Sequence, residues 1–182
     1  AGEKGKIPIT TESETALENY LKGRDLFEKL RAQESREYFQ KAVQADPDFA
    51  MGHLYLAQTQ ATAQGFFEEL EKAVALKDDV SEGERFWILG LQAGSNGDAA
   101  LQDKYYSKLV MAYPNDERAR NLYGNFLFGQ QRYAEAIESY EEGVAINPDY
   151  SLNYNMLGYS HRFMENYDEA EKAFQKYIAL VP

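Results

Sequence analysis

The chain has 182 residues, a formal net charge of −11 and no cysteine. The lack of cysteine excludes disulfides, thiolate metal sites and a cysteine nucleophile, and the negative charge disfavours nucleic acid and anionic membranes, which need a basic face. The apolar runs are far shorter than the roughly 20 residues of a bilayer span. We therefore expect a soluble protein without membrane insertion. Its localisation stays open between the cytoplasm and an exported, for example periplasmic, setting.

Prolines mark a fixed interval along the chain. Pro114, Pro148 and Pro182 occupy positions i, i+34 and i+68, and Pro47 falls one position short of two such intervals before Pro114. A period in this range is typical of stacked helical repeats. A shift of 34 also superposes matched pairs: Tyr123 with Leu157, Gly124 with Gly158, Tyr133 with Tyr167, Ala136 with Ala170, Tyr140 with Phe174 and Ile146 with Leu180. We predict an all-α array of about five repeats, at 13–47, 48–80, 81–114, 115–148 and 149–182.

Residues 1–12 precede the array and are predicted to be an extended segment. Ile7-Pro8-Ile9 is apolar and comes before the polar Thr10-Thr11 pair. We expect the apolar residues to pack as a short cap and the first helix to start near the threonines. Since no stretch rich in Pro, Gly and Ser interrupts the chain, we expect residues 1–182 to form a single repeat domain.

The second repeat is irregular, and the third opens with a capping signal. The first helix of the second repeat is placed after Phe49. The offset between Ala42 and Ala73 is 31, so three residues are missing, which we assign to the turn near Gln64-Gly65. Ser81 and Glu84 form a predicted capping box at the start of the third repeat. The glycine-rich segment 94–98 lacks the Lys-Ser/Thr of a phosphate loop and is predicted to be a turn between helices.

The fourth and fifth repeats are the most regular. Helices are predicted over about 116–129 and 133–146, and over about 150–163 and 167–180, because apolar residues recur there at intervals of three and four residues. Asp116 and Asp149 are the predicted N-caps of the two first helices. Gly124 and Gly158 are expected to allow close approach of the second helix in each repeat.

The pattern of these residues resembles the tetratricopeptide repeat. The fifth repeat carries the family's signature at Tyr154, Leu157-Gly158, His161, Ala170, Phe174, Tyr177 and Pro182, with His161 in place of an aromatic residue and Tyr177 in place of an alanine. The resemblance covers residues from about 11 to 182. It implies a right-handed α-α solenoid whose first helices line a concave groove, and a non-catalytic adaptor or scaffold that binds a peptide or protein segment.

A search for catalytic chemistry favours the same class. His53 and His161 lack metal-ligand spacing and fall near core positions, so we expect packed histidines. Adjacent acidic residues point in different directions on a helix and do not form an acid/base pair. We expect no enzyme activity, no cofactor and no metal site.

The family's groove positions define a candidate binding site. Amide side chains there offer a donor and an acceptor for a peptide backbone, and arginines offer partners for carboxylates. Aromatic residues at these positions more often pack in the core between repeats than bind a ligand, and the asparagines fit plain solvent exposure as well as ligand contact. The candidate residues are Trp87, Leu91, Arg118, Asn121, Asn125, Phe128, Asn155, Tyr159 and Arg162.

The last predicted helix leaves apolar residues uncovered, because no further helix follows it. Either more repeats continue the array beyond Pro182, or this end docks on another copy as a homodimer through Phe174, Tyr177 and Ile178. A structural self-association module, or a fragment of a longer array that spaces or regulates other domains, is therefore the alternative to groove binding. The identity of the partner and the biological process have no signal in the sequence.

Overall fold

The computed structural model describes residues 5–181, which contain ten α-helices and no β-strand. Two compact units divide the chain: the N-terminal unit is residues 7–102, and the C-terminal unit is residues 103–182 with residues 1–6. The N-terminal unit holds α1 (Glu14–Glu28), α2 (Ala32–Ala45), α3 (Ala50–Gln58), α4 (Ala63–Ala75), α5 (Glu82–Ser95) and the start of α6 (Ala99–Ala112). The C-terminal unit holds the rest of α6 with α7 (Glu117–Gly129), α8 (Tyr133–Ile146), α9 (Ser151–Phe163) and α10 (Tyr167–Leu180).

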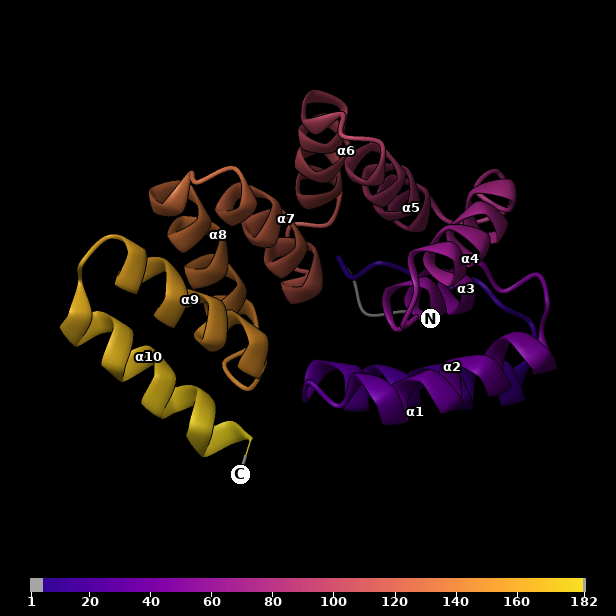
Figure 1. The fold of residues 1–182 in the computed structure, drawn as a ribbon, viewed down its shortest axis with the longest axis horizontal. Coiled ribbons are helices and arrows are strands. Elements are labelled where there is room, and N and C mark those ends of the chain that lie inside the picture. Colours follow the sequence, from indigo (N-terminus) through magenta and orange to yellow (C-terminus); the bar gives the residue numbers. More distant parts are fainter. Residues whose placement is uncertain (1–4, 182) are drawn as a thin grey trace. The chain divides into compact units, whose positions relative to one another are not determined.

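Neighbouring helices pair as hairpins, and hairpins stack within each unit. Figure 1 shows α1 beside α2 and α9 beside α10, and α3 packs with α4 as α7 packs with α8. The first helices also contact one another, α1 with α3, α3 with α5, and α7 with α9. The all-α repeat prediction is therefore confirmed. Whether residues 1–182 behave as one domain stays a prediction. Residues 1–4 of the predicted extended segment, and the turn proline Pro182, lie outside the described residues.

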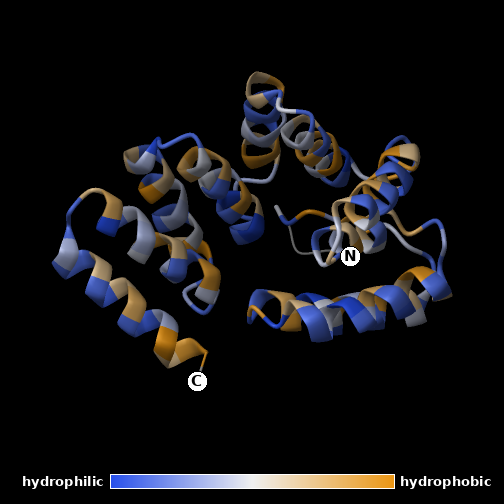
Figure 2. Ribbon diagram, viewed as in Figure 1, coloured by the Kyte–Doolittle hydropathy of each residue, from blue (hydrophilic) through white to orange (hydrophobic). Residues whose placement is uncertain are grey.

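A glycine on the first helix receives an aromatic ring from the second. A methyl group at Gly124 would overlap the ring of Tyr140, and one at Gly158 would overlap Phe174. Both rings follow their glycine by 16 positions, so the same contact recurs in successive hairpins. The expected close approach is confirmed. It lets Tyr140 be fully buried at the centre of its hairpin, whereas Phe174 in the last hairpin is half-buried. Figure 2 shows the resulting two-sided helices, with orange and blue alternating along α10.

The helix starts confirm some predicted caps and correct others. Asp116 accepts hydrogen bonds from the amides of Arg118 and Ala119, and Ser81 and Glu84 form the expected capping box. The Asp149 cap was wrong: α9 begins one residue later, its N-cap is Tyr150, and no side chain caps it. Tyr150 lies one repeat after Asp116, so the period places the cap at a position that lacks a suitable side chain. The first helix begins at Glu14 with Ser13 as its cap, and therefore not at the threonines.

The shortening in the second repeat also lies elsewhere than expected. α3 has 9 residues where α7 has 13, and it ends at Gln58. Thr62 then caps α4 by accepting a hydrogen bond from the amide of Gly65. Gln64 and Gly65 are therefore in the first turn of α4, and the missing residues come from the end of α3. A threonine cap following a threonine-rich turn fixes this start.

Candidate protein-binding face

Asparagine side chains connect α7 to α9 in the C-terminal unit. The Asn121 amide donates to Oδ1 of Asn153 over 3.0 Å, and the Asn125 amide donates to Oδ1 of Asn121 over 3.1 Å. The Tyr140 hydroxyl completes this hydrogen-bonded chain by donating to Oδ1 of Asn125 over 2.8 Å. Burial raises the pKa of Tyr140, which keeps the hydroxyl protonated as a donor. This network holds the Asn121 and Asn125 amides through both their donor and acceptor atoms, whereas the buried Nδ2 of Asn153 has no hydrogen-bond partner among the described residues.

Burial separates the structural members of this hydrogen-bonded network from the accessible one. Asn153 is 0% exposed and Asn121 is also buried, whereas Asn125 is exposed. Buried amides need partners inside the protein, so Asn121 serves the packing of α7 on α9. Asn125 is the accessible member of this hydrogen-bonded network, held between Asn121 and Tyr140.

Aromatic rings gather where the hairpins of the C-terminal unit turn. Phe128 packs edge-on against Phe163 with centroids 5.5 Å apart, and Tyr133 stacks on Phe163 at 5.1 Å. Phe163 is nevertheless 57% exposed, and Tyr159, which contacts Phe174 edge-on, is 40% exposed. The two α9 rings therefore combine a fixed position with accessible surface, the property of an interface anchor.

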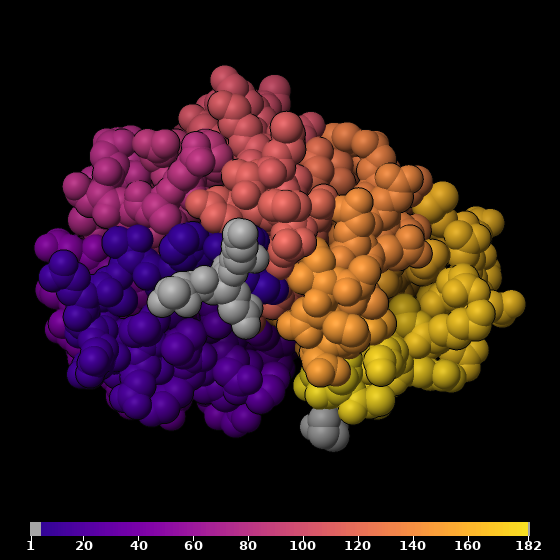
Figure 3. Space-filling view, turned by 180° about the vertical axis from the view of Figure 1, so that it is seen from behind, coloured from indigo at the N-terminus to yellow at the C-terminus, as the bar shows by residue number. Residues whose placement is uncertain are grey.

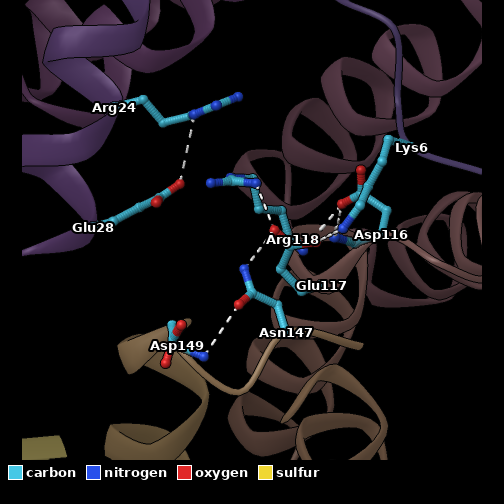
Figure 4. A network of polar contacts seen from close by, with 9 residues as sticks. Lys6, Arg24, Glu28, Asp116, Glu117, Arg118, Asn147 and Asp149 are labelled. Carbon is cyan, nitrogen blue, oxygen red and sulfur yellow. Dashed lines mark hydrogen bonds and ion pairs between the residues drawn. The ribbon is translucent and has the colours of Figure 1, made fainter. Parts of the chain in front are cut away.

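The two arginine candidates differ in their surroundings. Arg118 donates to Oε1 of Glu117 over 2.8 Å and lies over the ring of Tyr150 at 5.3 Å. Figure 4 shows it within a network in which Lys6 and Asn147 also contact the buried Glu117. Burial disfavours the charged form of Glu117, but the hydrogen bonds from Lys6 and Asn147 and the charge of Arg118 hold its pKa below the usual range.

Arg162 is the accessible cation. Its side chain is exposed on α9, and none of the ion pairs among residues 5–181 involves it. Arg118 is thus committed to a structural network, and Arg162 is available to a carboxylate outside the protein.

Trp87 and Leu91 lie in the N-terminal unit, on α5. Trp87 is 7% exposed and packs against Tyr55 with centroids 5.8 Å apart, while Leu91 is half-buried. The remaining seven candidates lie in the C-terminal unit. There, Asn121, Asn125 and Phe128 follow one side of α7, and Asn155, Tyr159 and Arg162 follow one side of α9, as spacings of three and four residues require.

Four contributors to this site stand outside the nine candidates: Phe163, Asn153, Tyr133 and Tyr140. Asn153 occupies the position that Ala119 holds one repeat earlier. A polar residue at a core position of the repeat is the signal that would have found it, because a buried amide must be paired. The packed-histidine prediction holds for His53, which is buried between the Glu69 carboxylate and the Pro47 carbonyl.

The chain belongs to the tetratricopeptide repeat family. Family models described as "Tetratricopeptide repeat" match residues 20–76 and 116–182. Membership implies a protein–protein interaction module, and proteins built from these repeats are generally non-catalytic.

Solved structures share the fold over most of their length. "Crystal structure of PilW, widely conserved type IV pilus biogenesis factor" has a TM-score of 0.59 and 16% identity, covering 92% of this chain and 78% of that one. MamA from Desulfovibrio magneticus RS-1 has a TM-score of 0.55 and 16% identity, with coverage of 93% and 97%. YrrB, described as "a TPR protein with an unusual peptide-binding site", has a TM-score of 0.52 and 19% identity, with coverage of 93% and 88%. At these identities the likeness shows the fold alone.

A curated relative matches part of the chain. Heat shock protein STI1 of Saccharomyces cerevisiae is 27% identical over 92 residues, which are 46% of this chain and 16% of the yeast protein. The chain therefore spans a small fraction of that relative's length. Within residues 5–181, no helix has the length and apolar character needed to cross a bilayer.

Proposed function

We propose that the chain is a non-catalytic binding module that holds a peptide or protein segment on the α7/α9 face, defined as Asn125, Phe128, Asn155, Tyr159, Arg162 and Phe163. The observation that carries this proposal is the combination of a fixed, exposed amide at Asn125 with exposed rings and an unpaired cation on the neighbouring helix. An amide of set orientation can bond a peptide backbone without reorganisation, which lowers the cost of binding.

The chemistry of the face defines the ligand. Tyr159 and Phe163 offer apolar contact, and Arg162 favours a carboxylate, so we expect a segment with an apolar or aromatic residue near an acidic one. Four groove candidates from the sequence have structural roles in our proposal, each within its own unit: Arg118, Asn121, Trp87 and Leu91.

Selection from a random peptide library tests this function without a known partner. Peptides selected on the wild-type chain are measured against Asn125→Ala and Arg162→Glu. A hydrogen bond contributes about 1 kcal/mol net, and more when one partner is charged. We therefore expect the affinity to fall about 5-fold for Asn125→Ala and at least 10-fold for Arg162→Glu. Lys104→Glu is the matched control, since it makes the same charge change at another exposed position of the C-terminal unit. Peptides that bind all variants equally would overturn the assignment.

Self-association through α10 is the second candidate function. Ile178 is 64% exposed, and Phe174 and Tyr177 are half-buried on the same helix. If a second copy covers this face, sedimentation of the wild type gives a dimer and Tyr177→Glu gives a monomer. A wild type that stays monomeric at high concentration removes this candidate.

A further inference from the structure

A buried carboxylate in the N-terminal unit depends on a distant segment of the chain. Glu84, in the first turn of α5, is 0% exposed. Its Oε1 accepts a hydrogen bond from the Thr10 amide over 2.8 Å, and its Oε2 accepts from the Thr10 hydroxyl over 2.6 Å and from the Ser81 amide over 2.9 Å. A buried charge without donors is costly. Since Oε1 receives its hydrogen bond from Thr10, the surroundings of Glu84 are complete only when an extended segment lies against them.

The rest of the segment is held in the manner of a bound peptide. The Pro8 carbonyl accepts a hydrogen bond from the Ser81 hydroxyl over 3.1 Å, the Thr11 hydroxyl donates to the Asp46 carboxylate, and Ile7 is buried. Residues 7–11 belong to no helix or strand. Main-chain hydrogen bonds, hydroxyl contacts and one inserted apolar side chain are how proteins recognise extended peptides.

We propose that the first turn of α5 and the turn between α2 and α3 form a second peptide-binding site, which the chain's own residues 7–11 occupy and which an extended segment of a partner protein takes over. We expect the ligand to have an apolar residue three positions before a threonine or serine. Proline cannot replace that threonine or serine, because the backbone amide there must donate to Glu84. The acidic Asp46 and Glu84 exclude an acidic ligand.

Displacement is feasible because the segment belongs to no helix and few contacts hold it. It joins α1 through the exposed Glu12, and only a few hydrogen bonds hold it, worth about 1 to 3 kcal/mol net each, so it can open without unfolding the helices. The need of Glu84 for donors is the same whether they come from this chain or from another. This site goes beyond the α7/α9 face and uses none of its residues.

A peptide supplied in trans tests the proposal on the full chain. In Thr10→Pro/Thr11→Ala the internal segment loses its amide and hydroxyl donors, while Glu84, Ser81 and Asp46 stay intact. A fluorescent peptide with the sequence of residues 5–13 should bind this variant about 10- to 100-fold more tightly than it binds the wild type, whose own segment competes. The same peptide with valine in place of Thr10 should bind about 10-fold more weakly.

A second measurement on the wild type covers the case in which the variant does not fold. An excess of the unlabelled peptide should accelerate hydrogen exchange at the chain's own Thr10 amide by displacing it. Unchanged exchange there, or a folded variant that fails to bind the peptide, overturns the proposal. Arg162→Glu should leave this binding unchanged, so failure here is distinguishable from failure of the α7/α9 face.

Discussion

The first helices of the two units differ in how deeply some of their aromatic side chains are buried. In the N-terminal unit, Tyr20, Tyr55 and Trp87 are buried against one another, with Tyr20 and Tyr55 at 5.4 Å and edge-on. In the C-terminal unit, Tyr159 and Phe163 of α9 are largely exposed. Figure 3 shows that the orange-to-yellow surfaces of α8 to α10 adjoin, as the contacts of α9 with both neighbouring helices require. One repeat type therefore provides a core in one unit and an accessible face in the other.

Overpacking at the glycine contact should have one of the two largest effects on stability, and it shows whether the hairpins share one packing rule. Gly124→Ala should lower the free energy of unfolding by about 2 kcal/mol, because the new methyl group overlaps the Tyr140 ring. Gly129→Ala on the same helix meets nothing within 4 Å and should be neutral or slightly stabilising. In the N-terminal unit, Gly23→Ala, with a smaller overlap onto Phe39, should cost less than Gly124→Ala. Urea unfolding measures all three, and equal values would contradict the rule.

The asparagine chain distinguishes a structural amide from a binding one. Asn121→Ala removes the donor to buried Asn153 and should cost about 1–3 kcal/mol of unfolding free energy. Asn125→Ala removes the acceptor of the buried Tyr140 hydroxyl at an exposed position that water can reach, so it should cost about 1 kcal/mol while weakening peptide binding. Urea unfolding in parallel with peptide titration measures both. The reverse order of stabilities would show that Asn125 is the structural amide.

Acid should destabilise both units through different carboxylates. Burial disfavours the charged form of Glu69, but hydrogen bonds from Lys72 and His53 hold its pKa below the usual value, as its surroundings do for Glu117. A carboxyl whose pKa is lower in the folded state contributes stability above its unfolded pKa, and that contribution is lost as pH falls through the folded pKa. The free energy of unfolding should therefore decrease as the pH falls from about 6 to about 3.

Neutral variants assign that acid dependence to the two carboxylates. Glu69→Gln and Glu117→Gln should each flatten the decline in part, because each removes one group whose pKa differs between the folded and unfolded states. A profile that is unchanged in both variants would place the acid dependence elsewhere.

The turns between paired helices should give the smallest effect. Gly97, Gln131 and Glu165 occupy the same position in three successive repeats, and all have positive φ, at 76°, 61° and 59°. A non-glycine residue there costs about 1 kcal/mol, so Gln131→Gly should raise the melting temperature slightly and Gly97→Ala should lower it. A decrease for Gln131→Gly would mean that its side chain contributes more than its backbone strain costs.

The sequence predicted the fold best where the period was kept. The helices at 133–146 and 167–180 match to the residue, because apolar spacing and the glycine contact recur there without insertions. The prediction for the second repeat was wrong at its turn. Missing residues can come from the end of a helix or from a loop, and only the Thr62 cap shows which of the two is shortened.

The candidate site was less predictable from the sequence. Projecting residues onto a helix face shows which side of the helix they lie on, but not which side chains of other helices they contact. Asn121 and Asn125 differ in burial through Asn153, which lies on another helix, and Arg118 differs from Arg162 through Glu117 and Tyr150. The docking of residues 7–11 joins positions 35 to 74 residues apart, and no local pattern encodes such pairings.

Hydrogen exchange of the chain with and without a library-selected peptide tests the central claim most directly. If the α7/α9 face holds the ligand, exchange slows along α7 and α9 in the wild type, and Arg162→Glu abolishes the slowing. Protection confined to α8 and α10 would contradict the account.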